Sequence, residues 1–214
     1  MNILNELQLL SEAKEKNLIG LTIDGKKITE KTPSEPWPGN FNCSGTKITS
    51  LEGAPSSVGG GFYCFNNQLT SLEGAPSSVG SDFGCYNNQL TSLEGAPSSV
   101  GGYFSCAYNN LTSLEGAPAL VDGAFGCFNN QLTSLTGIHK LLKQMDGEFG
   151  GHNNPIKSNV IGLLLVKGCN KVYLDNKQVQ DIMNKHLQSP FGHLRVLECQ
   201  SEMLDAGLDE WAKL

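Results

Sequence analysis

Hydrophobic residues return along this chain with a period of 21 positions between residues 39 and 160. In one unit Phe62 and Cys64 alternate with outward positions, and Leu69 and Leu72 follow. The Phe-x-Cys alternation has a period of two, which predicts a short strand with one face turned inward. Repetition every 20 to 50 residues or so is typical of stacked units. The pattern therefore predicts a solenoid of about seven coils, each containing a strand.

Two further residue types recur with the same period. An asparagine follows each strand, and its amide can satisfy backbone groups that a buried turn leaves unpaired. We therefore expect an amide ladder formed by Asn67, Asn88, Asn109, Asn130 and Asn154, with Thr46 in their place in the first coil. A cysteine also marks the same point of five coils, which favours reduced thiols packed in the core over disulfides. These are Cys43, Cys64, Cys85, Cys106 and Cys127.

The residues before the regular repeat are expected to cover one end of the stack, because solenoid ends expose apolar faces. Residues 1–38 are predicted to form an N-terminal helical cap and connection. Apolar spacing predicts an amphipathic helix over 2–16, and a strand or hairpin is expected over 19–28. The solenoid itself is assigned to residues 39–160, and one longer coil predicts a helical turn over 138–145.

The residues after the repeat are expected to cover the other end. Residues 161–214 are predicted to hold a last coil, beginning at 161–169, and a C-terminal helical cap. Apolar spacing predicts helices over 177–187 and 203–214. The alternative is that a terminal helix serves as a ligand for a partner.

The unit N-x-L-T-S-L-E-G-A-P-S-S-V resembles the leucine-rich repeat, with Phe and Cys in two strand positions that usually hold leucine. It is similar to the short bacterial class, with Glu-Gly in place of the first Pro element. The resemblance covers residues 39–160 and implies an α/β repeat with a curved parallel β-sheet and a concave face. The near identity of the repeats and the segment 198–208 also resemble repeat proteins of large tailed bacteriophages. That resemblance implies action inside a bacterium, in its cytoplasm.

Outward positions beside the inward Phe and Cys are rich in aromatic and amide side chains. Adjacent strands lie about 4.8 Å apart, so these side chains predict a continuous strip on the concave face. Contiguous exposed aromatics mark interaction surfaces. The alternative is that the rings only stack on one another and that the amides are turn residues. The candidate partner-binding residues are Tyr63, Phe65, Asn66, Tyr86, Asn87, Tyr103, Tyr108, Phe128, Asn129 and His152.

One glutamate per coil forms a second periodic set, the acidic ladder, made of Glu52, Glu73, Glu94 and Glu115. Like charges at coil spacing repel modestly when they are solvated. Three readings stay open: solvated or backbone-bonded carboxylates, a basic partner, or a cation such as calcium.

Charge and motif content narrow the function further. A net charge of −6 and a pI near 5.2 argue against binding to a phosphate backbone. The longest apolar run is too short for a membrane span, and no signal peptide is expected. The histidines lack metal-ligand spacing and no glycine-rich phosphate loop is present, so we expect no metal, no cofactor and no catalysis. The remaining enzymatic alternative pairs Cys169 or Cys199 with His186 or His193 as a nucleophile.

These patterns predict a non-enzymatic protein-binding module whose partner is a bacterial host protein, with no direct contact to nucleic acid or membrane. One alternative is a structural or self-assembling virion-associated protein. Another is an acidic mimic that binds a basic nucleic-acid-handling protein, and a glycan binder is a third. The sequence leaves the oligomeric state open.

Overall fold

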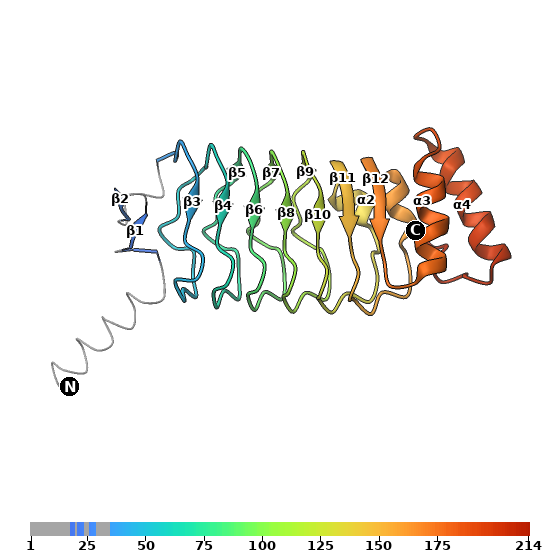
Figure 1. Cartoon of the computed structure of the whole chain (residues 1–214), viewed down its shortest axis with the longest axis horizontal. Coiled ribbons are helices and arrows are strands. Elements are labelled where there is room, and N and C mark those ends of the chain that lie inside the picture. The colour runs from blue at the N-terminus through green and yellow to red at the C-terminus, as the bar shows by residue number, and fades with distance from the viewer. Residues whose placement is uncertain (1–17, 20, 24–25, 29–34) are drawn as a thin grey trace.

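The computed structural model describes residues 18–19, 21–23, 26–28 and 35–214. Over the repeat region the chain winds into a parallel β-solenoid of about six turns, accompanied by a few helices. Figure 1 shows the turns stacked along the long axis of the molecule. The predicted solenoid is therefore confirmed.

Two ladders of short parallel strands run along the solenoid and lie next to each other in one sheet. The first ladder aligns the same residue of every turn, so that Phe62 lies opposite both Phe41 and Phe83. The two ladders join in β11 (Gln144–Gly150). The first half of this strand pairs with β9 and its second half pairs with β10. The first ladder comprises β3 (Phe41–Asn42), β4 (Phe62–Tyr63), β6 (Phe83–Gly84), β8 (Phe104–Ser105), β10 (Phe125–Gly126), β11 and β12 (Lys167–Tyr173). The second comprises β5 (Ser78–Val79), β7 (Ser99–Val100), β9 (Leu120–Val121) and β11.

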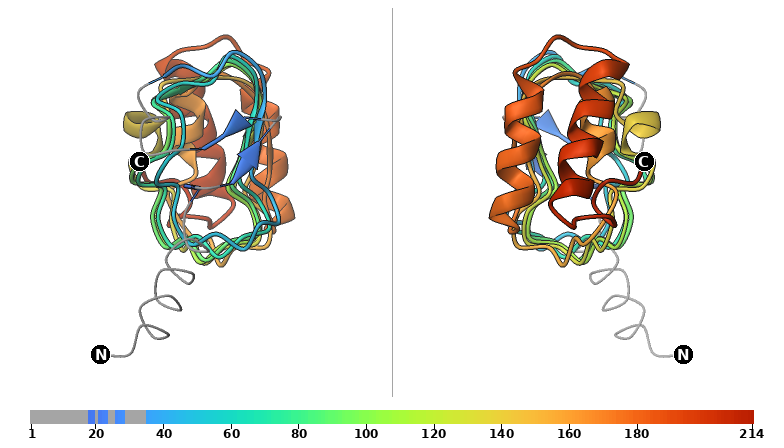
Figure 2. Two further views of the ribbon diagram at one scale, coloured as in Figure 1. Left: turned by 90° about the vertical axis from the view of Figure 1, so that its left-hand side faces the viewer. Right: turned by 90° about the vertical axis from the view of Figure 1, so that its right-hand side faces the viewer.

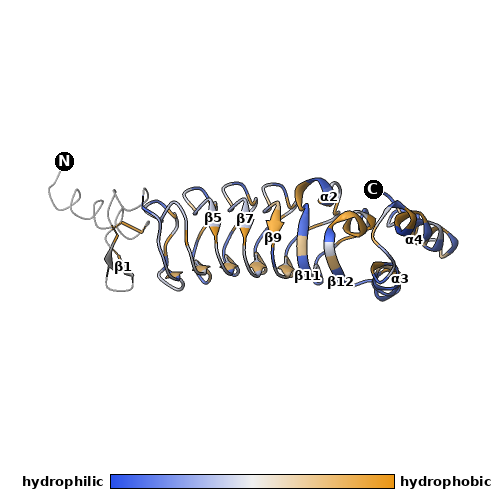
Figure 3. Ribbon diagram, turned by 90° about the horizontal axis from the view of Figure 1, so that it is seen from above, coloured by the Kyte–Doolittle hydropathy of each residue, from blue (hydrophilic) through white to orange (hydrophobic). Residues whose placement is uncertain are grey.

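The stack runs nearly straight in Figures 1 and 3, whereas the sequence predicted a curved sheet with a concave face. Curvature in a solenoid requires wider spacing on one side than on the other. Here backbone hydrogen bonds join successive turns at other parts of the coil as well, from the N–H of Gln89 to the carbonyl of Leu69 and from the N–H of Ser98 to the carbonyl of Ser77. These bonds impose a similar spacing of about 4.8 Å around the coil. We therefore call the outer surface of the first ladder the strand face.

The core is a set of identical side chains stacked turn upon turn. Phe41, Phe62, Phe83, Phe104, Phe125 and Phe149 are fully buried, with neighbouring ring centroids 5.0 to 5.6 Å apart. All seven cysteines are free and buried. The prediction of reduced core thiols is confirmed for each repeat cysteine.

The predicted amide ladder is also present, and each amide bonds at least three backbone groups. In the turn of Asn88, Nδ2 donates to the carbonyls of Cys64 and Cys85, both at 3.0 Å, while Oδ1 accepts from the N–H of Leu69 at 3.0 Å. Asn67, Asn109, Asn130 and Asn154 repeat this pattern. Two of these bonds reach back to the preceding turn. In the first turn Thr46 donates instead to the carbonyl of its own Cys43.

The N-terminal prediction is tested only in part. The antiparallel pair β1 (Thr22–Ile23) and β2 (Lys26–Lys27) confirms the expected hairpin. The helix expected over 2–16 lies outside the described residues. The longer coil contains α2 (Ile138–Leu141), a helical turn as predicted, although residues 144–145 already belong to β11.

The predicted frame of the last coil is wrong. Residues expected to begin a coil at 161–169 form instead a 3-10 helix, η2 (Ile161–Leu165). The next strand of the ladder is β12, in which Val172 pairs with Phe149 and so takes the place of the repeat Phe. Apolar spacing alone could not separate the two, because Leu164 and Val172 are both fully buried.

Two helices, α3 (Lys177–Leu187) and α4 (His193–Asp205), lie across the C-terminal end of the stack in Figure 2. The helix predicted over 177–187 is confirmed. The helix predicted over 203–214 is wrong, because α4 begins earlier and ends before Gly207. Gly207 has a left-handed backbone (φ 71°), which is a typical helix stop.

Side chains of α3 hydrogen-bond the outer edge of β12. Gln180, Asn184 and Gln188 are spaced four residues apart, so they line one face of the helix. Asn184 accepts from the N–H of Val172 at 2.7 Å and donates to its carbonyl at 3.0 Å. Gln180 accepts from the N–H of Leu174, and Gln188 donates to the carbonyl of Asn170. The amides thus replace the hydrogen bonds that a further strand would make.

Replacing Asn184 by leucine should lower the free energy of unfolding by about 2 kcal/mol, because two backbone groups of the buried Val172 lose their partners. Urea denaturation of the two proteins measures the difference. Gln178→Leu is the matched control, since Gln178 is exposed on the same helix and should change stability by less than about 0.5 kcal/mol. Equal effects of both substitutions would contradict this role of Asn184.

Candidate functional site

The predicted strip lies on the strand face, with its residues in register from turn to turn. Phe65 and Tyr86 stack with ring centroids 4.4 Å apart and planes 8° apart. Phe128 and His152 stack in the same way at 4.7 Å and 6°. Tyr63 meets the edge of Phe65, and Tyr108 meets the edge of Phe128. The structure therefore brings the predicted aromatic residues into two neighbouring clusters.

Stacking leaves the four rings Phe65, Tyr86, Phe128 and His152 half-buried. Part of the predicted aromatic surface thus stabilises the ladder, as the alternative interpretation proposed. Tyr103 and Tyr108 differ from them, because both are exposed. The two tyrosines are therefore the rings of this surface that are most available to a partner.

The amides of the strip have a local structural role. Asn66, Asn87, Asn129 and Asn153 each adopt a left-handed backbone with φ between 54° and 56°. Asparagine tolerates this conformation better than most residues, because its short polar side chain can bond locally. Asn87 in addition donates to Oδ1 of Asn66 at 2.6 Å. This position in the coil selects asparagine for its backbone geometry.

Coil four breaks the pattern at two adjacent residues. Ala107 takes the place of the stacked ring and is buried, whereas Tyr108 takes the place of the left-handed asparagine. Tyr108 has φ 53° and is 53% exposed. A left-handed backbone costs a residue such as tyrosine about 1–2 kcal/mol. The chain therefore holds an exposed aromatic ring at a position where asparagine would be more stable.

Small residues make room for the tyrosine rings on the strand face. The hydroxyl of Tyr103 lies over Gly126, where a Cβ atom would collide with it. A Cβ atom at Gly84 would contact the rings of Tyr63, Phe65 and Tyr86 at 3.5 to 3.7 Å. Tyr103 is 37% exposed, and the partial burial of its phenol raises the pKa of that group above its ordinary value. The phenol therefore stays protonated at neutral pH and can donate a hydrogen bond.

The acidic ladder lies on another edge of the coils. Its four carboxylates are exposed, and each glutamate N–H is bonded by a serine hydroxyl two residues earlier, at 3.0 to 3.4 Å. The serines Ser50, Ser71, Ser92 and Ser113 thus serve the turn. No cluster of three or more potential metal ligands occurs within the described residues.

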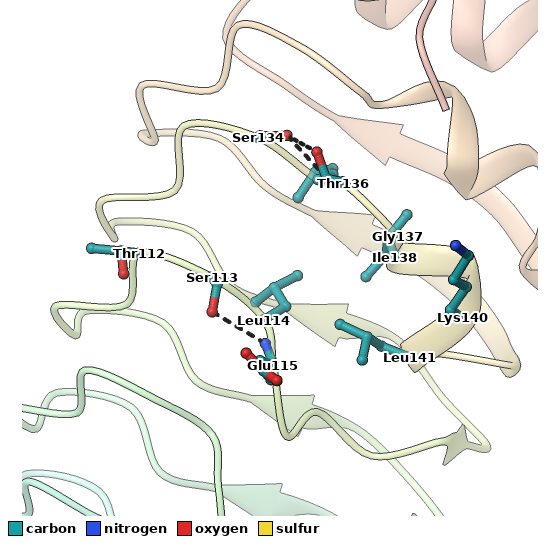
Figure 4. Close-up of a pocket in the computed structure, with 11 residues that line it drawn as sticks. Thr112, Ser113, Leu114, Glu115, Ser134, Thr136, Gly137, Ile138, Lys140 and Leu141 are labelled. Atoms are coloured by element: carbon teal, nitrogen blue, oxygen red, sulfur yellow. Dashed lines mark hydrogen bonds between the residues drawn. The ribbon is translucent and has the colours of Figure 1, made fainter.

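A hollow of about 350 Å³ opens beside the last glutamate of this ladder, where α2 interrupts the repeat (Figure 4). In the preceding coil Ala117 and Pro118 hold the positions of Ile138 and His139. The lining is mixed, with four apolar side chains, four hydroxyl side chains, and Glu115 and Lys140 as its charged members. The sequence analysis missed this hollow, although the loss of the Ala-Pro pair was a signal for it. Its apolar lining consists of Leu114, Leu135, Ile138 and Leu141.

Two residues of the enzymatic alternative, Cys199 and His186, take other partners. The thiol of Cys199 contacts Met183, and His186 bonds Glu202 at 2.8 Å. Burial raises the pKa of Cys169 and of Cys199 to about 12. Thiols with such a pKa are protonated at neutral pH and are poor nucleophiles.

Within the described residues, every helix is too short or too polar to cross a lipid bilayer. Comparison of the chain with protein-family models, with curated proteins and with solved structures finds no match.

Proposed function

We propose that this chain is a non-enzymatic protein-binding module that takes its partner on the strand face. The observation that carries the proposal is the exposed Tyr108 in a left-handed backbone. Strain of this kind at an exposed position is typical of functional sites, because stability alone would remove it. Tyr103 stands near it as a second exposed ring. Tyrosine is among the residues that most often anchor protein interfaces.

The type of coil, the C-terminal cap and the kind of partner are proposed from other observations. The repeat spacing supports a leucine-rich-repeat-like coil, and the amides of α3 on β12 support a C-terminal helical cap. The resemblance to repeat proteins of tailed bacteriophages supports a partner in the cytoplasm of a bacterial host. The exposed acidic ladder supports a second candidate function, a mimic that binds a basic nucleic-acid-handling protein. Binding of that kind should weaken steeply with salt.

Tyr108→Asn separates binding from stability. The substitution restores the residue found at this position in neighbouring coils, so we expect stability to stay constant or rise by up to about 1 kcal/mol. Capture of the partner from bacterial lysate should fall at least tenfold for the Tyr103→Ala, Tyr108→Asn double variant. Mass spectrometry of the captured proteins and thermal melting of each variant give the two readouts.

Leu120→Ser is the matched control. Leu120 is exposed on the second ladder, where neighbouring coils carry Ser78 and Ser99. This variant restores a repeat residue on the second ladder, outside the strand face, and should capture the partner as the wild type does. Equal capture by the double variant would refute the strand face as the binding site. If the double variant still captures the partner and this capture is lost at high salt, the result would favour the acidic mimic.

A further inference from the structure

Helix α4 presents an apolar stripe to solvent. Leu194, Leu197 and Leu204 are 69%, 61% and 50% exposed, and Ser201 between them is exposed as well. The opposite side of the helix holds the buried residues that pack on α3 and η2. We call Leu194, Leu197, Ser201 and Leu204 the α4 stripe. It is unusual because the other apolar residues of this helix are buried.

The spacing of the stripe is that of a helix seam. Steps of three, four and three residues separate its members, which is the a and d pattern of a coiled coil. A seam of this kind packs against a second helix with the same pattern. Leucines of a second copy would fill the spaces between the leucines of the first, with the two Ser201 residues at the centre.

Charges beside the stripe favour one orientation of that pair. Helix geometry places Glu198 and Asp205 along one side of the stripe and His193 and Gln200 along the other. In an antiparallel pair the acidic sides would face each other and repel. In a parallel pair the carboxylates of each helix face His193 and Gln200 of the other copy. Gln200 is uncharged and its amide donates to the carbonyl of Ala212 of its own chain. The parallel arrangement is therefore favoured because it keeps the acidic sides apart.

The position of α4 allows a second copy to approach without a clash between the two solenoids. In Figure 1 the helix lies at the outermost end of the molecule and runs across the long axis of the solenoid. A two-fold axis parallel to α4 would place the two solenoids on opposite sides of the helix pair, pointing away from each other. The strand edge beneath is already occupied by Gln180, Asn184 and Gln188. Association at this end thus proceeds through helix faces instead of through strand addition.

We propose that two copies of this chain associate end to end through their α4 stripes as a parallel, two-fold symmetric dimer. A standard interface buries about 800 Å² on each partner, and the largest apolar patch of a typical monomer covers about 300–600 Å². The stripe would form the apolar centre of the interface, with Phe191 and the charged flanks around it. A two-fold interface closes on itself, so assembly stops at two copies. The dimer would carry two strand faces, and its existence is independent of what they bind.

Sedimentation equilibrium over a range of concentrations tests the dimer. The wild type should shift from 23.0 kDa toward twice that mass as concentration rises. Leu197→Glu with Leu204→Glu should hold the protein at the monomer mass, with a far-UV spectrum like that of the wild type. Leu120→Ser, which removes an exposed leucine from the second ladder, should dimerise normally. A wild type that remains monomeric at several hundred micromolar, or a double variant that still dimerises, would overturn the proposal.

A single cysteine tests the orientation. In the parallel pair the two residues 201 meet at the two-fold axis, whereas in an antiparallel pair centred on the stripe residue 201 lies opposite Leu197. Ser201→Cys should therefore form a covalent dimer under mild oxidation, and reducing agent should reverse it. The native thiols do not compete, because all seven are buried. A variant that dimerises without cross-linking would overturn the parallel arrangement.

Discussion

Replacing Asn88 by alanine should lower the free energy of unfolding by at least about 3 kcal/mol. Its amide bonds the carbonyls of Cys64 and Cys85 and the N–H of Leu69, all of them inside the solenoid. Alanine reaches none of these groups, and each buried backbone group without a partner costs about 1–3 kcal/mol. Two of the groups belong to the preceding turn, so the loss affects the contact between turns. Urea denaturation measures the change.

Two further substitutions exclude simpler explanations of such a loss. Asn110→Ala removes an exposed amide near the same turn and should change stability by less than about 0.5 kcal/mol. Asn88→Asp keeps the size of the side chain but replaces the donating amide by an oxygen that faces two carbonyls. We expect it to destabilise the protein at least as much as alanine does. An aspartate variant as stable as the wild type would show that shape, and not hydrogen bonding, selects asparagine.

The amide ladder and the core could be predicted from the sequence because the same residue types recur at the same position of each repeat. A buried Phe or Cys at one position carries little information, but its return every 21 residues identifies the inward face. The same argument identified Asn88 and its equivalents as turn residues. Where the period fails, so did the prediction: the frame of the last coil was wrong, because residues 161–165 form a 3-10 helix.

The sequence predicted where the candidate site lies, but it did not predict how exposed its side chains are. Position in the repeat placed Phe65 and Tyr86 outside the core, but it could not reveal that their rings stack and are half-buried. The curvature of the sheet depends on hydrogen bonds between turns outside the first ladder, and these join backbone groups that leave no side-chain pattern in the sequence. The strain at Tyr108 depends on a backbone angle, and the α4 stripe on a helix boundary that the pattern misplaced. Each of these requires coordinates.

The protein should unfold on mild alkaline titration, at about pH 10. Burial is the main cause that raises the pKa of every cysteine, to about 12 for Cys43, Cys169 and Cys199. The remaining four, Cys64, Cys85, Cys106 and Cys127, are also raised. In the unfolded chain a thiol ionises near its ordinary pKa of about 8.5. The folded state therefore binds more protons than the unfolded state above that pH.

The sign of the effect follows from this difference in bound protons. Below the ordinary thiol pKa both states are protonated, so the stability is fully present. As pH rises from about 8.5 toward the raised pKa, each thiol that stays protonated in the fold removes about 1.4 kcal/mol per pH unit. Several thiols acting together would offset a typical stability of 5–15 kcal/mol within roughly one to two units. Burial of Tyr63 and Tyr103 raises their pKa and adds a loss of the same sign at higher pH.

Urea denaturation at a series of pH values, in the presence of reductant, measures this slope directly. Cys85→Ala provides the control, because its effect on the slope differs from its effect on the starting stability. Removing one core thiol lowers the free energy of unfolding by an amount that does not depend on pH. It should also make the fall of this free energy with pH above 8.5 shallower by about 1.4 kcal/mol per pH unit. A variant with the wild-type slope would mean that Cys85 ionises equally in both states. Burial of Cys85 between the turns would then have no effect on the pKa of its thiol.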